Sequence, residues 1–262
     1  MSESLRALTE LERKIYIRNM LVPEIGEAGQ VKLLGSRVLV VGLGGLGSPA
    51  LFYLAAAGVG EIGIMDGDEV DYSNLQRQIL HGRGDIGKPK VDSARATISR
   101  LNPDARLNEY KTVLTSENAD EIVARYDFVI EATDNFEAKF LVNDTCVRLG
   151  KAFSHAGILG TFGQTMTVVP GAGPCYRCIF EKVPAPGTYE TTSTVGVLGS
   201  VAGVMGTIQA TEAIKYLLGM GGLLVGRLLT WEALEMAFRE VKLPSDKRCG
   251  MCRPRTPSAN ER

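Results

Sequence analysis

A short apolar run leads into a glycine-rich turn and then into a segment with helical character. The run is "RVLVVG" from Arg37, and its continuous, β-branched composition predicts a buried strand. Ser48 and Pro49 fit a helix start, because proline is favoured in the first turn, and Gly58 can end that helix. Residues 61–66, "EIGIMD", predict a second strand. Together these segments predict a strand–helix–strand unit.

The same alternation continues through the middle of the chain. Residues 91–102 and 136–150 have the pattern of helices, and residues 126–135 predict a strand that runs into a polar turn. Residues 161–169 are strand-like. Alternating strands and helices are typical of a parallel, doubly wound sheet.

The second half of the chain changes character. Residues 201–219 are apolar on nearly every side, which predicts a buried helix. Residues 226–234 and 236–244 resemble a final pair of strands. We therefore expect an α/β fold: a Rossmann-like, doubly wound, mostly parallel sheet with an antiparallel C-terminal extension.

One continuous domain with an N-terminal helical arm is expected. Residues 1–35 form the arm, whose helical pattern is interrupted by the link "PEIGEAGQ" at 23–30. Residues 36–252 form the domain. They include a loop at about 182–199, rich in proline, glycine and threonine, and long loops of this kind tend to be functional. The tail, 253–262, is expected to be disordered.

Composition excludes several classes of protein. The chain has 262 residues, of which 45% are hydrophobic and 23% charged, with a net charge of -1. These values are ordinary for a soluble globular protein, and no basic excess indicates nucleic acid. The charged start is not a secretory signal, and glycines break the apolar runs that a membrane span needs. A reducing cytoplasm is the expected location.

The glycine-rich turn indicates a phosphate ligand. Gly42, Gly44 and Gly47 match G-x-G-x-x-G, with Gly45 as an extra glycine. Such a turn lets a phosphate approach backbone N–H groups at a helix N-terminus. Asp66 ends the next strand, where a carboxylate can accept hydrogen bonds from ribose hydroxyls. The alternative is a tight turn without a ligand.

The residues after this turn favour a triphosphate over a dinucleotide. Arg77 and Lys90 follow the ribose carboxylate closely, and such cations suit additional phosphate charge. Asp134, in "EATDNFEAK", follows a strand's carboxyl end, and a carboxylate there is a natural ligand for Mg²⁺ on a nucleotide. The alternatives are solvated surface cations and, for Asp134, an N-cap of the next helix. The capping and metal-binding interpretations are compatible.

Four of the five cysteines form two C-x-x-C pairs far apart in the sequence. Cys175 with Cys178 and Cys249 with Cys252 can complete a tetrahedral zinc site. Four thiolates leave no open position on the metal, so this zinc would be structural. A redox dithiol or plain reduced thiols are the alternatives.

The remaining reactive side chains are interpreted as structural. Cys146 lies in a predicted helix and is expected to be a small buried apolar residue. His81 and His155 belong to neither a serine elbow nor a metal-ligand spacing. We expect both histidines to support the fold or the residues around a site.

In their order along the chain these segments resemble the activating enzymes of ubiquitin-like proteins, in particular the bacterial sulfur-carrier adenylyltransferases of molybdopterin and thiamin biosynthesis. The resemblance runs from about Tyr16 to Cys252. "SNLQRQ" joined to "GKPK" and a following "TDN" is far more specific than the glycine turn alone. The matching segments are "GLGGLGSPA", "MDGDEVDYSNLQRQIL", "GKPK", "EATDNF", "GPCYRC", "GVLGSVAGVMGTIQATEAIKYLLG", "GRLLTWEAL" and "CGMC".

The resemblance implies that ATP and Mg²⁺ bind together with a small ubiquitin-like sulfur-carrier protein ending in Gly-Gly. The carrier's terminal carboxylate would attack the α-phosphorus, giving an acyl-adenylate and pyrophosphate. Arg18 would reach the phosphates of the other subunit, so that activity would require a homodimer. The catalytic set implied is Arg18, Arg77, Lys90 and Asp134. The ATP-binding set implied is Gly42, Gly44, Gly45, Gly47, Asp66, Asp68, Asn74, Arg77, Lys90, Asp134 and Asn135.

Three positions depart from the pattern of the family. The neighbours of Arg18 differ from the usual "RYxRQ", and Lys139 stands where an arginine is common. Thr192 occupies the position of a cysteine in the mobile loop, and a threonine cannot form a thioester or persulfide. We therefore expect an enzyme that adenylates without forming a covalent conjugate. No rhodanese-like extension follows the tail, so a separate sulfur-donor protein is expected.

Other functions remain open at this point. An NAD-dependent oxidoreductase would use the same glycine turn, but it leaves Arg77, Lys90, Asp134 and the cysteine pairs unexplained. A catalytically silent scaffold that binds a ubiquitin-like protein is a second alternative. A third is ATP-dependent activation of a tRNA base or a peptide carboxylate. The sequence does not name the carrier or its pathway.

Overall fold

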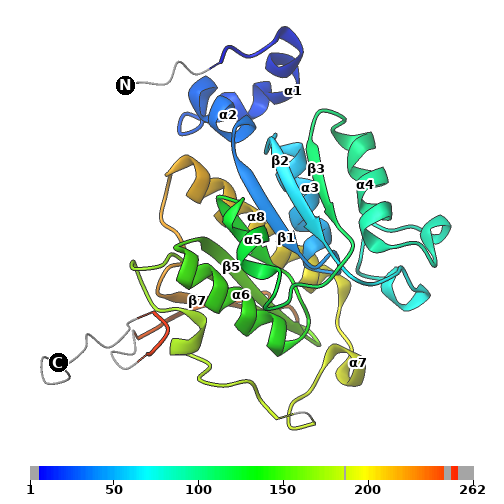
Figure 1. Cartoon of the computed structure of the whole chain (residues 1–262), viewed down its shortest axis with the longest axis vertical. Coiled ribbons are helices and arrows are strands. Elements are labelled where there is room, and N and C mark those ends of the chain that lie inside the picture. Colours follow the sequence, from blue (N-terminus) through cyan, green and yellow to red (C-terminus); the bar gives the residue numbers. More distant parts are fainter. Residues whose placement is uncertain (1–5, 186, 245–248, 253–262) are drawn as a thin grey trace, which may run out of the picture.

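The computed structural model describes residues 6–185, 187–244 and 249–252, so the predicted tail at 253–262 lies outside the described residues. Within them, the strands form one sheet in the order β3-β2-β1-β4-β5-β6-β7-β8 (Figure 1). The strands are β1 (Arg37–Val41), β2 (Glu61–Met65), β3 (Arg106–Tyr110), β4 (Phe128–Glu131), β5 (Ala152–Leu159), β6 (Phe162–Val168), β7 (Arg227–Glu232) and β8 (Ala237–Lys242).

The sheet has a parallel part and an antiparallel part. Strands β3, β2, β1, β4 and β5 are parallel, with Val38 of β1 opposite both Ile62 and Phe128. Strands β5 to β8 pair antiparallel. The strand order reverses between β1 and β4, and ligands of such sheets bind beyond the carboxyl ends at that point. The predicted fold class is confirmed.

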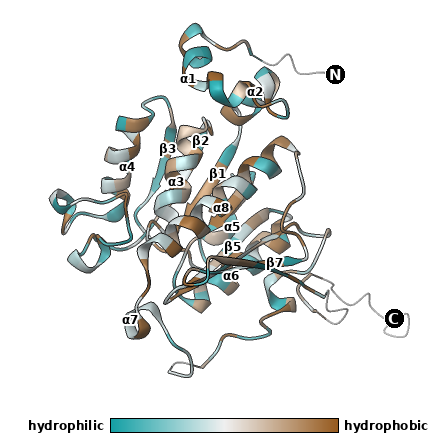
Figure 2. Cartoon of the chain, turned by 180° about the vertical axis from the view of Figure 1, so that it is seen from behind, coloured by the Kyte–Doolittle hydropathy of each residue, from teal (hydrophilic) through white to brown (hydrophobic). Residues whose placement is uncertain are grey.

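Helices cover both faces of the parallel part. Val38 and Val40 pack in the core beneath α3, α4 and α8, whereas Leu39 and Val41 pack in the core beneath α5 and α6. Burial on both faces explains why β1 is apolar from Val38 to Val41, the brown part of the strand in Figure 2, after an exposed Arg37 at its start. The helices are α1 (Glu10–Met20), α2 (Gly26–Leu34), α3 (Gly47–Ala56), α4 (Lys90–Leu101), α5 (Ala119–Ala124), α6 (Phe136–Leu149), α7 (Thr192–Val195) and α8 (Gly199–Leu218), with 3₁₀ turns η1 (Tyr72–Asn74), η2 (Arg83–Asp85) and η3 (Tyr176–Cys178).

The N-terminal helices lie at the end of the molecule where β1 begins, and α7 lies at the opposite end (Figure 1). The side-chain amides of Asn19 and Gln30 donate to the Ala57 carbonyl at 3.3 and 3.0 Å, which ties both helices to the end of α3. The predicted link at 23–30 is wrong in its second half, because α2 begins at Gly26. Burial of Val31 and Leu33, together with the hydrogen bond of Gln30, stabilises this helix against the domain despite its two glycines. In the described part of the chain, no helix combines the length and the apolarity that crossing a membrane needs.

Candidate active site

A cavity of about 500 Å³ lies at the carboxyl ends of the parallel strands, at the reversal point of the sheet. Its two halves differ in chemistry. The glycine-turn half is lined by the turn after β1 and by polar residues after β2 and β4, among them Asp66, Arg77, Lys90 and Asp134. The aromatic half is lined by residues of β5 and β6, η3 and the loop before α8. Its rings are Phe162, Tyr176, Phe180 and Tyr189.

The turn after β1 is closed so tightly that only glycine fits two of its positions. Gly42 has φ +96°, and a Cβ there would lie 2.6 Å from the carbonyl oxygen of Ala132 on the neighbouring chain segment. A Cβ on Gly47 would overlap the carbonyl oxygen of Gly42. This close packing brings the start of α3 to the end of β1. Gly44 and Gly45 line the cavity, whereas Gly47 does not.

Asp66 and Lys90 lie together on the floor of the glycine-turn half. The carboxylate of Asp66 accepts hydrogen bonds from the backbone N–H groups of Leu43 and Asp68, at 2.8 and 2.9 Å. Lys90 is buried, and its Nζ lies 2.8 Å from Asp68 and 3.7 Å from Asp66. Lys90 is thus not a solvated surface cation. Its ammonium faces the cavity beside a largely exposed carboxylate that a ligand can displace.

Arg77 reaches the cavity from the segment after η1. Its Nη1 donates to the Ser73 carbonyl at 2.8 Å, and its aliphatic stem passes close to Gly45. Arg77 is half-buried and lines the cavity, but Asn74 does not. The Asn74 Oδ1 accepts from the backbone N–H of Asp71 at 3.1 Å, as part of the capping box of η1.

Asp134 and Asn135 occupy the turn between β4 and α6. The Oδ1 of Asn135 accepts from the backbone N–H of Ala138 at 2.8 Å, so Asn135 is the N-cap of α6. The capping alternative for Asp134 is therefore wrong. Among the described residues, the Asp134 carboxylate is exposed, lines the cavity and has no hydrogen-bond or ion-pair partner. Such a carboxylate fits a magnesium ligand beside a nucleotide.

A buried charged cluster, which no sequence motif indicated, lies directly behind this turn. Glu131, the last residue of β4, is fully buried and contacts the ammonium of Lys139 at 3.1 Å and Nδ1 of His155 at 2.7 Å. Burial alone raises the pKa of Glu131, but Lys139 and then the hydrogen bond of His155 outweigh it and lower this pKa to about 2. A glutamate inside a predicted buried strand was the signal that could have revealed this cluster.

The two histidines have different surroundings. His81 is buried, with Nδ1 2.9 Å from the Ser93 hydroxyl and Nε2 3.0 Å from the Leu43 carbonyl oxygen, so it supports the glycine turn. His155 lines the aromatic half of the cavity beneath Tyr176, whose ring centroid is 4.6 Å from its own. Burial first, and then the ammonium of Lys139, lower the pKa of His155, which favours a neutral ring.

The loop before α8 forms one wall of the cavity. Tyr189 packs edge-on against Phe136 at the start of α6, with the ring centroids 4.7 Å apart. Thr192, the first residue of α7, lines the cavity. The loop ends on the β5–β6 turn, where the N–H of Leu198 donates to the carbonyl of Gly160 at 2.8 Å.

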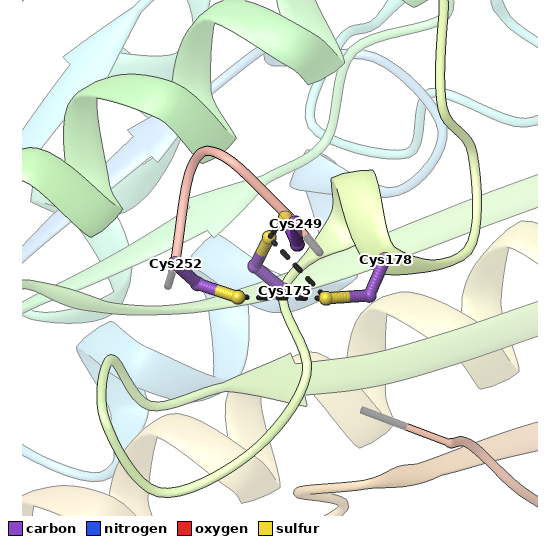
Figure 3. A group of neighbouring side chains, drawn as sticks. All are labelled: Cys175, Cys178, Cys249 and Cys252. Atoms are coloured by element: carbon purple, nitrogen blue, oxygen red, sulfur yellow. Dashed lines mark hydrogen bonds between the residues drawn. The ribbon is translucent and has the colours of Figure 1, made fainter. Parts of the chain in front are cut away.

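The four paired cysteines converge at one point away from the strand ends. Figure 3 shows their sulfur atoms pointing toward one another, and all four lie within 4.8 Å of each other. The Sγ–Sγ distances include 3.8 Å for Cys175 with Cys249 and 3.4 Å for Cys178 with Cys252. Four thiolates about 2.3 Å from one zinc ion would have a similar spacing. The cluster therefore fits a tetrahedral metal site.

The first cysteine knuckle is fixed to α6. The N–H of Tyr176 donates to Asn143 at 2.9 Å, and the guanidinium of Arg177 binds both carboxylate oxygens of Asp144 at 2.6 and 2.7 Å. Tyr176 thus connects the cysteine cluster to the aromatic half of the cavity. Cys146, in contrast, is fully buried in the core, and burial raises the pKa of its thiol, as expected for a structural residue.

The sheet is doubly wound, and a glycine-rich turn and two cations, Arg77 and Lys90, meet where its strand order reverses. This combination defines a nucleotide-binding α/β protein. The chain belongs to the ThiF family, whose model matches residues 16–252.

Relatives from several organisms share most of the chain. The SAMP-activating enzyme E1 of Haloferax volcanii is 46% identical over 93% of this chain and 89% of its own length. The sulfur carrier protein adenylyltransferase of Thermus thermophilus is 44% identical over 93% of this chain and 91% of its own. A probable adenylyltransferase/sulfurtransferase MoeZ of Mycobacterium tuberculosis is 41% identical over 99% of this chain but only 65% of its own.

Solved structures share the fold at lower identity. The crystal structure of E. coli MccB with MccA-N7isoASN superposes with a TM-score of 0.80 at 23% identity, over 90% of this chain and 74% of MccB. At this identity the likeness supports the architecture alone.

Proposed function

We propose that this protein uses ATP to adenylylate the C-terminal Gly-Gly carboxylate of a ubiquitin-like sulfur carrier, releasing pyrophosphate. The observation that carries the proposal is the meeting of Arg77, Lys90 and Asp134 with the glycine turn around one cavity. The relatives from Haloferax and Thermus support it, because one is named as an activating enzyme and the other as a sulfur-carrier adenylyltransferase.

The reaction forms one bond and breaks another at the α-phosphorus. A carrier carboxylate oxygen attacks this atom, and the bond to the bridging oxygen of pyrophosphate breaks as the electron pair leaves with pyrophosphate. Lys90 and Arg77 offset the charge that develops on this leaving group. Asp134 would hold Mg²⁺, which would supply neutralisation of phosphate charge. Asp66, whose carboxylate is already fixed by two backbone N–H groups, orients the ribose.

The aromatic half of the cavity receives the carrier's tail. A Gly-Gly terminus has no side chains, so it can lie against the rings that line this half of the cavity, among them Tyr176 and Tyr189. Its carboxylate then meets the nucleotide beside Asp134. Proximity and orientation supply much of the rate in such a reaction.

The proposed structural zinc lies at Cys175, Cys178, Cys249 and Cys252 and clamps the segment after β8 onto η3. None of these thiols lines the cavity, and neither does Cys146. The cavity therefore offers no thiol for a covalent link with the carrier. We infer that sulfur arrives from a separate donor protein after adenylylation.

The proposed active unit is a homodimer. Arg18 is exposed on α1, at the end of the molecule opposite α7, and does not line the cavity of its own chain. Its neighbours Ile15 and Ile17 are 50% and 44% exposed, which suits contact with a second copy. Arg18 would then contribute to the partner's phosphates.

An ATP–pyrophosphate exchange assay with candidate Gly-Gly-terminated carriers tests the proposal. We expect exchange with one carrier, and a loss of at least about 100-fold in Asp134→Ala and Lys90→Ala. Lys88→Ala is the matched control, because Lys88 is an exposed lysine that pairs with Asp85 outside this cavity. Carrier-independent ATP binding without exchange for any carrier, or full exchange in both variants, contradicts the proposal.

A further inference from the structure

The buried ion pair between Glu131 and Lys139 lies directly beneath the turn that carries Asp134. We propose that Lys139 is a positioning residue: it fixes the Asp134 turn so that the carboxylate can take Mg²⁺ on the nucleotide. This inference rests on the proposed nucleotide chemistry and adds a residue to it.

Lys139 joins three segments of the fold. Its ammonium donates to the carbonyl of Thr133 at 2.7 Å, the residue immediately before Asp134. It donates to the carbonyl of Ala156 on β5 at 2.9 Å, and it contacts Glu131 on β4 at 3.1 and 3.2 Å. One ammonium therefore fixes the turn to two adjacent strands.

Glu131 holds the same turn from the other side. Its Oε1 accepts from the backbone N–H of Thr133 at 2.8 Å and from the Thr133 hydroxyl at 2.5 Å. Its Oε2 accepts from His155 at 2.7 Å. Thr133 is thus held through its N–H, hydroxyl and carbonyl by a single buried pair.

Asp134 depends on this support. In the described structure its carboxylate has no hydrogen-bond partner, and Asn135 caps α6 in its place. The direction of the Asp134 side chain is therefore set by its backbone. Groups that orient a metal ligand from behind typically change metal affinity by 10- to 100-fold when they are removed.

A purely structural role for the pair is the competing explanation, and it would affect folding alone. Lys139→Met by itself leaves Glu131 as a buried, unpaired charge, which is strongly destabilising. The main variant is therefore Lys139→Met with Glu131→Gln, which removes both charges and keeps an amide oxygen for Thr133. Lys139→Arg keeps a cation at this position, as a guanidinium in place of an ammonium.

The matched control is a second lysine–glutamate pair, in which the carboxylate is buried and the lysine is partly exposed. Lys215 contacts Glu212 at 2.6 Å on α8, and neither residue lines the cavity. Lys215→Met with Glu212→Gln therefore removes an equivalent ion pair without touching the Asp134 turn.

The experiment measures ATP affinity by titration calorimetry, with magnesium in excess and with EDTA, for the full-length protein and each variant. We expect the affinity gained from magnesium to fall about tenfold or more in the Lys139/Glu131 double variant, with ATP affinity in EDTA unchanged. Lys139→Arg should recover most of the gain, and the Lys215/Glu212 variant should keep all of it.

The possible results distinguish a failure of the positioning role from a failure of the proposed function. If the wild-type protein shows magnesium-dependent ATP binding and the Lys139/Glu131 variant matches it, the positioning role is overturned and the proposed function stands. If the wild-type protein binds no ATP with magnesium, the proposed function itself fails. A Lys215/Glu212 variant that loses the magnesium gain equally would show a general packing effect and would also overturn the inference.

Discussion

At the scale of single residues, the cavity combines side chains that are already held with side chains left free. Asp66 is fixed by two backbone N–H groups, and Glu131 is enclosed by Thr133, Lys139 and His155. The carboxylate of Asp134, in contrast, makes no hydrogen bond or ion pair with the described residues. This division suits a site in which the scaffold is rigid before the ligand arrives.

The substitution Thr192→Ala tests whether the residue at the usual cysteine position takes part in adenylation. Thr192 lines the cavity from α7, but a hydroxyl there forms no thioester or persulfide. Pyrophosphate exchange in this variant should stay within about twofold of the wild type. A loss similar to that of Asp134→Ala would assign Thr192 a direct role.

Acid should expose the contribution of Glu131 to stability. Its pKa is lowered from 4.5 to about 2 in the folded state, so its ionised form stabilises the protein above pH 4.5 and this effect is lost as the pH falls toward 2. Between about pH 5 and pH 3 the linkage amounts to about 2 kcal/mol. Urea unfolding should show that the wild type loses about this much more stability than Glu131→Gln over that interval. Equal losses in both proteins would show that Glu131 does not titrate in this way.

At the scale of elements, apolar segments and the glycines that end them were sufficient to predict most of the fold. The strand at 37–41 and the helix at 199–218 follow from continuous apolar segments that end at glycine. Four elements were not predicted: β3, β5, α5 and α7. Strand β3, "RLNEY", lies at an edge of the sheet and is mostly polar, and α5 is only six residues long. Their structure comes from pairing and packing with neighbours, which a local pattern does not contain.

The candidate site likewise has one part that the sequence predicted and one part that only the structure revealed. The glycine turn, Arg77, Lys90 and Asp134 belong to contiguous motifs and were predicted to act near one ligand. The cluster of Glu131, Lys139 and His155 arises because β4 and β5 pair with Glu131 opposite His155. Register between strands cannot be read from either segment alone, so this cluster needed the structure.

The cysteine cluster leads to a prediction about thermal stability and zinc content. Cys249→Ser should lower Tm by roughly 4–8 °C, because a structural metal site contributes at least about 2 kcal/mol to a chain of this size. The zinc content measured by metal analysis should fall from one ion per chain in the wild type to none in the variant. Cys146→Ser, which alters a buried thiol outside the cluster, should keep its zinc. A wild-type protein that contains no metal and is only as stable as Cys249→Ser contradicts this assignment.

At the scale of the whole molecule, the N-terminal arm and the cavity lie at opposite ends. The arm formed by α1 and α2 is attached to the domain through Ala57, at the end of the molecule away from α7. Arg18 is therefore remote from its own cavity, although it belongs to the catalytic set that the family implies. The proposed symmetric pair of chains would resolve this separation, because each arm could then serve the other chain's cavity.

Mixed dimers test this arrangement directly. Arg18→Ala removes the arm's contribution and Asp134→Ala removes the cavity's, so each homodimer should be inactive in pyrophosphate exchange. In a dimer of one Arg18→Ala chain and one Asp134→Ala chain, one composite site carries both substitutions and the other carries neither. Random assortment makes half of the dimers mixed, so co-refolded protein should recover about a quarter of wild-type activity. If Arg18 instead acted within its own chain, every site would carry one substitution and no activity would return.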